Sequence, residues 1–158
     1  MPALRELLEG AGFADVRTYL QSGNVVLKSG KAPEHVAREC ERLLASELGL
    51  ELAVIVRTRT QLAAVVRRNP LGAVADDPKR YQVTFLAGPL PAATVRKLEA
   101  AVTPPEQLVV AGREVYAWHP NGVGRSRLAT LLGGKSLGVA ATARNWTTVE
   151  ALLELAEA

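Results

Sequence analysis

Residues 107–118 read Gln-Leu-Val-Val-Ala-Gly-Arg-Glu-Val-Tyr-Ala-Trp, two apolar runs on either side of a short turn. Both runs are rich in the β-branched and aromatic residues that favour strands. The tripeptide Ala111-Gly112-Arg113 between them has the composition of a tight turn. This stretch predicts an antiparallel hairpin with strands at 107–110 and 114–118.

The segments around this hairpin complete a regular pattern of strands and helices. We predict a strand at 81–87, a helix at 91–102, a helix at about 125–132, a short strand at 139–143 and a last helix at 146–156. The order from residue 81 onward is therefore βαββαβ followed by a helix. That order is the ferredoxin-like unit.

The first half of the chain repeats the pattern without its first strand. The expected elements are a helix at 2–9, strands at 16–20 and 25–29, a helix at 33–48 and a strand at 52–56. We therefore predict an α+β fold of duplicated ferredoxin-like units with antiparallel sheets, in which the first strand of the first unit is missing. The whole chain, 1–158, is expected to form a single compact domain. Its parts are a first ferredoxin-like half at 1–58, a connecting helix and loop at 59–80, and a second ferredoxin-like half at 81–158. At the start of the connecting helix, Thr58 and Gln61 fit a capping box.

Neither 52–56 nor 114–118 shows the alternation of polar and apolar residues that a sheet with one open face requires. Both faces of the sheets are therefore expected to be at least partly buried. The two halves then pack their sheets on each other, or the chain forms a homodimer through one of them.

The composition is that of an ordinary globular protein, with 48% apolar and 22% charged residues in 158. No apolar stretch reaches the length of a membrane span, and the first residues do not resemble a signal peptide. Cys40 is the single cysteine, so no intrachain disulfide can form. We expect a cytoplasmic protein that does not associate with membranes.

Charge is distributed unevenly around a formal net charge of +3. Residues 53–146 hold 13 Lys and Arg against 5 Asp and Glu, whereas the remainder holds 6 against 11. A basic middle indicates an electropositive surface that would attract a polyanion. The alternative is an uneven but merely solvated surface.

The sequence offers weak support for a metal site or a catalytic cysteine. His35 and His119 are far apart in the chain and are expected at the surface, and Asp76-Asp77 before Pro78 is typical of a turn. Cys40 falls on the apolar stripe of its helix, which favours a buried thiol. We therefore expect neither a metal nor a cofactor, and no catalytic residue can be assigned.

Two glycine-rich stretches approach nucleotide-binding motifs without matching them. Gly134-Lys135-Ser136 resembles the end of a P-loop, but a helix and not a strand precedes it. Residues 122–127 begin like a dinucleotide loop, but Arg127 stands where the third glycine is required.

An anion site is the chemistry that the motifs favour. Arg125 and Ser126 lie at a predicted helix start after a glycine-rich loop, and Arg144 and Asn145 lie at the start of the last helix. The alternative for Asn145 is plain helix capping, and for Trp146 an anchor in the core. The candidate ligand-binding residues are Gln21, Asn24, Arg125, Ser126, Arg144 and Asn145.

Several ordered motifs carry a resemblance to a known family. They are Thr18–Val26, Asn69-Pro70, Val83–Leu86, Pro120–Ser126 and Thr142–Val149. Together they resemble a widespread bacterial family catalogued as domain of unknown function 1697. The resemblance covers essentially the whole chain and implies the duplicated ferredoxin-like fold, but it implies no activity.

The start of the chain departs from that family. Members usually begin with a strand and a glycine-rich turn resembling Tyr-Val-Ala-Leu-Leu-Arg-Gly-Ile-Asn, whereas this sequence begins at the helix that follows. We therefore expect Met1 to be an internal methionine, with the true start upstream. N-terminal sequencing of the native protein tests this expectation.

Three classes of function remain open. The first is a non-catalytic domain that binds nucleic acid or another anionic ligand. The second is an enzyme acting on a small anionic substrate, although no Asp, Glu or His lies inside the motifs to act as a base. The third is a structural or interaction protein in which the motif residues serve only turns and caps.

Overall fold

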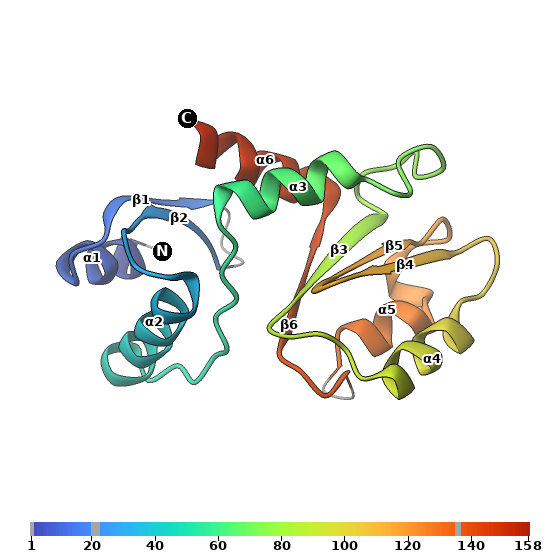
Figure 1. The fold of residues 1–158 in the computed structure, drawn as a ribbon, viewed down its shortest axis with the longest axis horizontal. Coiled ribbons are helices and arrows are strands. Elements are labelled where there is room, and N and C mark those ends of the chain that lie inside the picture. The colour runs from blue at the N-terminus through green and yellow to red at the C-terminus, as the bar shows by residue number, and fades with distance from the viewer. Residues whose placement is uncertain (1, 20–22, 135–136) are drawn as a thin grey trace. The chain divides into compact units, whose positions relative to one another are not determined.

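The computed structural model describes residues 2–19, 23–134 and 137–158, and its chain divides into two units (Figure 1). Unit 1 comprises residues 1–63 and 151–158, and unit 2 comprises residues 64–150. The division falls within α3 (Arg59–Arg68) and within α6 (Trp146–Glu157). Gln21 and the pair Lys135-Ser136, singled out in the sequence, lie outside the described residues.

Unit 2 is built on a four-stranded antiparallel sheet. Its strands are β3 (Tyr81–Leu86), β4 (Gln107–Ala111), β5 (Glu114–Trp118) and β6 (Ala141–Asn145). The strand order is β4-β5-β3-β6, so β3 is central and pairs with both β5 and β6. The mixed α and β composition and the antiparallel pairing agree with the fold class expected from the sequence.

Helices α4 (Ala92–Ala101) and α5 (Arg127–Leu132) cover one face of this sheet, which we call the helix face. The core beneath them consists of aliphatic residues from the strands, the two helices and the loop before β6. Its fully buried members are Leu86, Leu98, Ala101, Val115, Ala117, Leu128, Leu132 and Leu137. Strand alternation places Val115 and Ala117 on this face and Tyr116, which lies between them, on the other.

The opposite face of the sheet is also buried, and we call it the aromatic face because Tyr81, Tyr116 and Trp118 lie on it. The ring of Tyr81 stacks on Trp146 with a centroid distance of 4.8 Å. The Tyr116 hydroxyl donates a hydrogen bond of 2.9 Å to the Val65 carbonyl oxygen of α3. For unit 2, the predicted burial of both sheet faces is therefore confirmed.

Unit 1 contains α1 (Pro2–Gly10), a two-stranded antiparallel sheet of β1 (Ala14–Tyr19) and β2 (Asn24–Lys28), and α2 (Pro33–Leu48). As the sequence predicts, α2 begins at Pro33 and ends at Leu48, and Gly49, with a φ of 64°, caps its C-terminus. The buried core of this unit consists of Leu8, Phe13, Val16, Val36 and Cys40.

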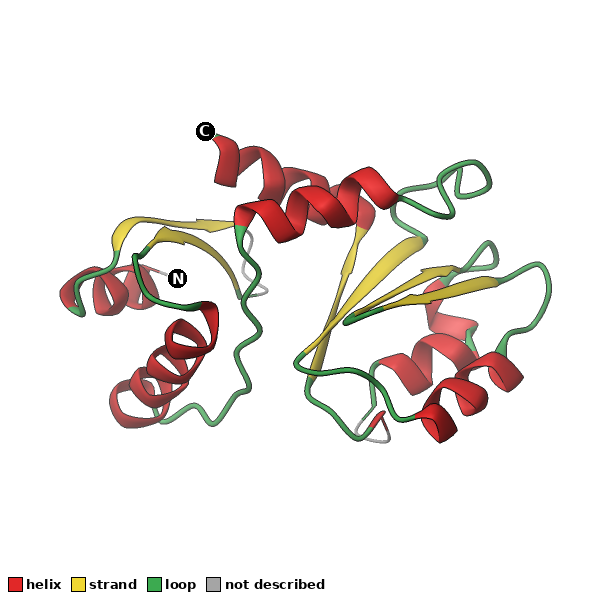
Figure 2. Cartoon of the chain, viewed as in Figure 1, coloured by secondary structure: helices red, strands yellow, loops and turns green. Residues whose placement is uncertain are grey.

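The predicted strand at 52–56 is wrong, because residues 49–58 form no strand or helix (Figure 2). A strand requires a neighbour to pair with its backbone groups. In unit 2 the last strand, β6, pairs with β3, and the described part of unit 1 contains no strand that corresponds to β3. The Val54 amide instead donates to the Glu41 carboxylate at 2.8 Å.

Helix α3 begins with the predicted capping box. The Thr58 amide donates to the Gln61 side chain at 2.8 Å, and the Gln61 amide donates to the Thr58 hydroxyl at 3.1 Å. Among the described residues, no helix combines the length and the apolar character needed to cross a bilayer.

Candidate functional site

Ser126 lies at the junction between a short 3-10 helix, η1 (Val123–Arg125), and α5. Its hydroxyl oxygen accepts a hydrogen bond of 3.0 Å from the Ala129 amide, which makes Ser126 the N-cap of α5. Gly122 precedes η1 with a φ of 95°, a conformation that favours glycine. This local sequence fixes where α5 begins and how the residues on either side of Ser126 are presented.

The Ser126 hydroxyl also belongs to a buried cluster with Glu106 and His119. The hydroxyl donates to Glu106 Oε2 at 2.5 Å, and His119 Nδ1 lies 2.9 Å from the same oxygen. The Ser126 Oγ and His119 Nδ1 atoms are 3.1 Å apart. One carboxylate oxygen therefore joins the segment before β4, the segment after β5 and the start of α5.

The register of the sheet explains why these residues meet. Glu106 directly precedes Gln107 of β4, His119 directly follows Trp118 of β5, and Gln107 pairs with Trp118. Because Gln107 and Trp118 lie on the aromatic face, alternation directs Glu106 and His119 to the helix face, where α5 begins. The signal in the sequence is the inward series of Val115, Ala117 and His119, whose last member lies one residue beyond the predicted strand.

The prediction that His119 lies at the surface is wrong, because its side chain is fully buried. An isolated histidine in a sequence is usually exposed, and the partner that allows this one to be buried, Glu106, is 13 residues away in the chain. His35, by contrast, has an exposed side chain 3.5 Å from the Glu39 carboxylate.

The cluster shifts the ionisation of Glu106. Burial by itself raises the pKa of this carboxyl, but hydrogen bonds from His119, Ser126 and the Thr103 amide outweigh it, so the pKa lies below its usual value. Because the Glu106 carboxylate can only accept, His119 Nδ1 donates the hydrogen bond between them, and the other ring nitrogen is Nε2. That Nε2 atom is buried and has no hydrogen-bond partner in the described part of the chain.

The sequence motifs contain no acid or base, and the structure brings two such groups to Ser126 from outside them. A hydroxyl, a carboxylate and an imidazole are the groups of nucleophilic catalysis. However, the side chains of Glu106 and His119 are only 8% and 0% exposed, and residue Ser126 only 7%. This burial favours a role in holding the loop between β5 and α5.

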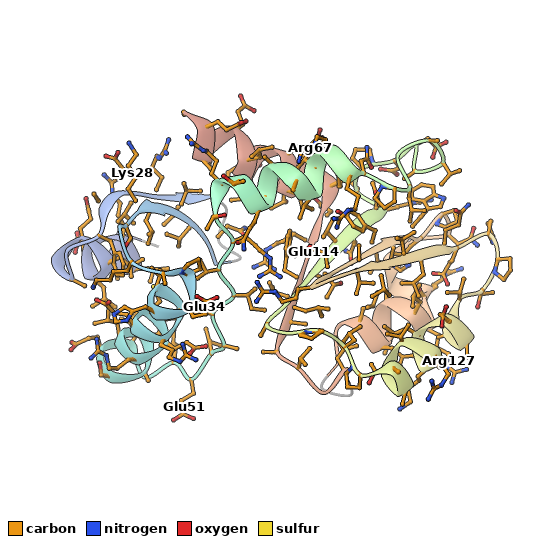
Figure 3. All side chains as sticks on the ribbon, viewed as in Figure 1. Lys28, Glu34, Glu51, Arg67, Glu114 and Arg127 are labelled. Carbon is orange, nitrogen blue, oxygen red and sulfur yellow. The ribbon has the colours of Figure 1, made fainter. Side chains whose placement is uncertain are left out.

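Four exposed cations lie beside Ser126 or on the neighbouring helix α4. Arg125 and Arg127 flank Ser126, and Arg96 and Lys97 lie on α4, which contacts α5. Figure 3 shows Arg127 at the layer formed by these two helices. In the described ranges, none of the four forms an ion pair with a carboxylate. The arrangement offers several guanidinium and ammonium groups to an anion.

The other predicted site residues have local partners. Arg144 pairs with Val83, which places it on the aromatic face, and its guanidinium donates to the Thr142 hydroxyl at 2.5 Å and to the Ala143 carbonyl at 2.8 Å. Burial lowers the pKa of Arg144. Asn145 caps α6, because its side-chain oxygen accepts from the Thr148 amide at 2.9 Å.

The structure thus brings Arg125 and Ser126 together at the start of α5 and places Arg144 on the other face of the same sheet. Asn24 belongs to unit 1, where its side-chain amide donates to the Tyr19 carbonyl at 3.1 Å. Within the described residues, no cluster of three His, Cys, Asp or Glu side chains is arranged to hold a metal ion. Asp77 accepts a hydrogen bond from the Lys79 amide at 3.0 Å, which is the predicted turn chemistry.

A conserved bacterial protein, SP0830 from Streptococcus pneumoniae, has a similar structure, with a TM-score of 0.75 and 18% sequence identity. The superposition covers 99% of this chain and 88% of that protein. None of the curated proteins compared with the chain matches it. A family model described as "Protein of unknown function (DUF1697)" matches residues 1–116, and the chain therefore belongs to the DUF1697 family.

Proposed function

We propose that unit 2 is a non-catalytic binding domain for polyanions such as nucleic acid. The residues that would contact the ligand are Arg125 and Arg127, on either side of the hydrogen-bonded Ser126, and Arg96 and Lys97 on the neighbouring helix. The observation that carries the proposal is the presence of exposed cations on three contacting elements: Arg96 and Lys97 on α4, Arg127 on α5, and Arg125 on η1. Guanidinium groups suit phosphate because they donate in a planar fork.

The distribution of charge supports the choice of unit 2. Its residues include 11 Lys and Arg against 6 Asp and Glu, whereas those of unit 1 include 8 against 10. A net positive unit attracts a polyanion over distances of about 8–10 Å at moderate salt. Unit 1 has a net negative charge, which does not favour a polyanionic ligand.

The Glu106–His119–Ser126 cluster supports a binding role because it fixes the loop that carries Arg125. Two hydrogen bonds to Glu106 join this loop to the segment before β4, and a third contact links its own residues His119 and Ser126. A loop that is ordered before binding loses little conformational entropy when the ligand arrives. The same burial argues against the alternative of an enzyme that uses these groups.

The buried aromatic face limits the kind of recognition that we propose. Proteins that read single-stranded bases stack them on exposed aromatic rings. Tyr81, Tyr116 and Trp118 are each less than a tenth exposed, so they offer no such platform. We therefore propose binding through phosphates, with strong dependence on salt and little dependence on sequence.

We also infer that the chain is a duplication of ferredoxin-like units whose first unit lacks its first strand. In unit 2 the order β3-α4-β4-β5-α5-β6 and the strand order β4-β5-β3-β6 support this inference. In unit 1 the order α1-β1-β2-α2, followed by the segment 50–58, supports the correspondence from α4 onward. The single cysteine supports a cytoplasmic location for this chain.

Fluorescence anisotropy with labelled single-stranded DNA at low salt tests the proposed function. The double variant Arg125→Ala/Arg127→Ala should weaken binding by at least about tenfold, because it removes two phosphate contacts. The matched control is Arg38→Ala/Arg42→Ala, which removes the same charge from exposed positions on α2 of unit 1.

The control variant should bind within about twofold of the unchanged protein, because it lies outside the proposed surface. Equal weakening by both double variants would mean that only net charge matters. Absence of binding by the unchanged protein at low salt would exclude the proposed function.

A further inference from the structure

Three elements of unit 2, α4, η1 and α5, carry the four exposed cations, and we call them the cationic elements. Helix α5 contacts both α4 and η1. The three elements contain one carboxylate, that of Glu99, so their net charge is +3. A nucleic acid that approaches them meets cations for its phosphates and little negative charge to repel it.

The aromatic residues of the chain lie away from these cations. The sequence contains two Trp, three Tyr and two Phe, and the structure describes all of them. Those in unit 2 are each less than a tenth exposed: Tyr81, Phe85, Tyr116, Trp118 and Trp146. In unit 1, Phe13 is buried in the core, and Tyr19 of β1 is half-buried. The one aromatic ring with appreciable exposure therefore belongs to the unit with a net negative charge.

The burial of these rings affects single and double strands differently. Proteins that bind single strands gain about fivefold to 150-fold in affinity for each base that stacks on an exposed ring. In a duplex the bases are already stacked on each other, and most protein contacts go to the phosphates and sugars. A unit that offers cations without rings therefore lacks a main source of affinity for single strands and keeps the source that serves a duplex.

Given the function proposed above, on which this inference rests, we propose that the ligand of unit 2 is a double-stranded nucleic acid. Counterion release gives a slope of log affinity against log salt of about −0.9 per phosphate contact for a duplex and about −0.7 for a single strand. With four otherwise equivalent contacts, and equal affinities at about 1 M salt, the duplex binds about tenfold more tightly at about 50 mM salt. The advantage falls to about fourfold at about 200 mM.

The feature that selects a duplex is its high density of phosphates, which DNA and RNA duplexes share. Fluorescence anisotropy with a labelled DNA duplex, a labelled RNA duplex and a labelled thymidine homopolymer with the same number of phosphates separates the sources. A duplex of either kind should bind about tenfold more tightly than the homopolymer at about 50 mM salt. The tighter of the two duplexes identifies the kind of nucleic acid.

An added ring should remove the preference. Ala93 is exposed on α4, one helical turn before Arg96 and Lys97. Ala93→Trp should strengthen binding of the homopolymer by at least about fivefold and change binding of the duplex by less than about twofold. The matched control is Ala45→Trp, at an exposed position on α2 of unit 1, which should change neither.

A second double variant tests whether the guanidinium planes themselves carry bases, as they do in some RNA-binding proteins. Arg125→Lys/Arg127→Lys keeps both charges and removes both planes. The ratio of duplex affinity to homopolymer affinity should stay within about twofold of its value for the unchanged protein. A loss of affinity for the homopolymer alone would overturn the proposal, because it would mean that the unchanged unit stacks bases.

The outcomes separate this proposal from the function on which it rests. Homopolymer binding as tight as duplex binding at about 50 mM salt, or an Ala93→Trp variant without a gain for the homopolymer, overturns the preference for a duplex. The proposed function survives either result if binding still weakens with salt and in Arg125→Ala/Arg127→Ala. Absence of binding to all three nucleic acids at low salt overturns both.

Discussion

At the scale of single residues, Glu106 makes the least replaceable contacts of the candidate site. Its Oε2 atom accepts hydrogen bonds from both His119 and Ser126, and its Oε1 atom accepts one of 3.2 Å from the Thr103 amide. A glutamine at position 106 would keep one accepting oxygen, but its NH2 group would face one of these hydrogen-bond donors. The buried donors of His119 and Ser126 therefore need the carboxylate as their acceptor, and the carboxylate needs their hydrogen bonds to be buried.

We predict that Glu106→Gln destabilises the protein by about 1–3 kcal/mol, because it leaves a buried donor without an acceptor. The matched control is Glu99→Gln at an exposed position of α4, which should change stability by less than about 0.5 kcal/mol. Urea unfolding followed by tryptophan fluorescence measures both, since Trp118 and Trp146 lie in unit 2. Equal effects of the two variants would contradict the role assigned to Glu106.

The stabilising effect of Glu106 should depend on pH in a defined direction. The pKa of Glu106 is lowered in the folded protein relative to its ordinary value of 4.5, so the carboxylate stabilises the folded state. This contribution is complete above pH 4.5 and disappears as the pH falls through the lower, folded-state pKa. The difference in unfolding free energy between the unchanged protein and Glu106→Gln should therefore shrink in acid. A difference that stays constant down to pH 3 would contradict this account.

Residue-level prediction from the sequence succeeded where the interaction is local. The capping box of Thr58 and Gln61 spans three residues and appears as predicted. Glu106 and His119 were not recognised, because their contacts join positions 13 and 20 residues apart and depend on strand pairing. Local patterns cannot specify such contacts until the sheet register is known.

At the scale of elements, α2 shows how an apolar stripe determines burial. Cys40 falls on that stripe and is buried in the core of unit 1, as its spacing predicts. Burial raises the pKa of the Cys40 thiol, with smaller contributions from Glu39 and Glu41. Both effects reduce the fraction of reactive thiolate at neutral pH.

We predict that iodoacetamide labels Cys40 in the folded protein more than about tenfold more slowly than in the urea-unfolded chain. Because the chain contains a single cysteine, total labelling followed by mass spectrometry gives the rate for this residue alone. The slow rate should rise along the unfolding transition of unit 1. Similar rates in the folded and unfolded protein would show that α2 does not shield the thiol.

The elements of unit 2 were predictable because each has a strong local pattern. Its strands and helices begin and end within a few residues of the predicted bounds. The strand expected at 52–56 was not found, although its sequence is as β-branched as that of any strand in the chain. Strand formation there depends on a pairing strand that the described residues of unit 1 do not supply. A local sequence pattern cannot show whether such a strand is present.

At the scale of the whole molecule, the two units differ in charge and in the state of their sheets. Unit 2 has a complete sheet, a buried aromatic face and an excess of cations, whereas unit 1 has a two-stranded sheet and an excess of anions. The sequence predicted the excess of basic residues in the middle of the chain. It could not indicate that the helix carrying Arg96 and Lys97 contacts the helix that begins at Arg127, since that depends on how α4 and α5 pack.

The salt dependence of DNA binding tests the central claim most directly. If the four cations each contact a phosphate, a plot of log affinity against log salt for single-stranded DNA should have a slope of about −3. Affinity would then fall about fiftyfold between about 50 and 200 mM salt, with little difference between DNA sequences. A slope near zero, or affinity that follows base sequence and resists salt, would contradict binding through this cationic surface.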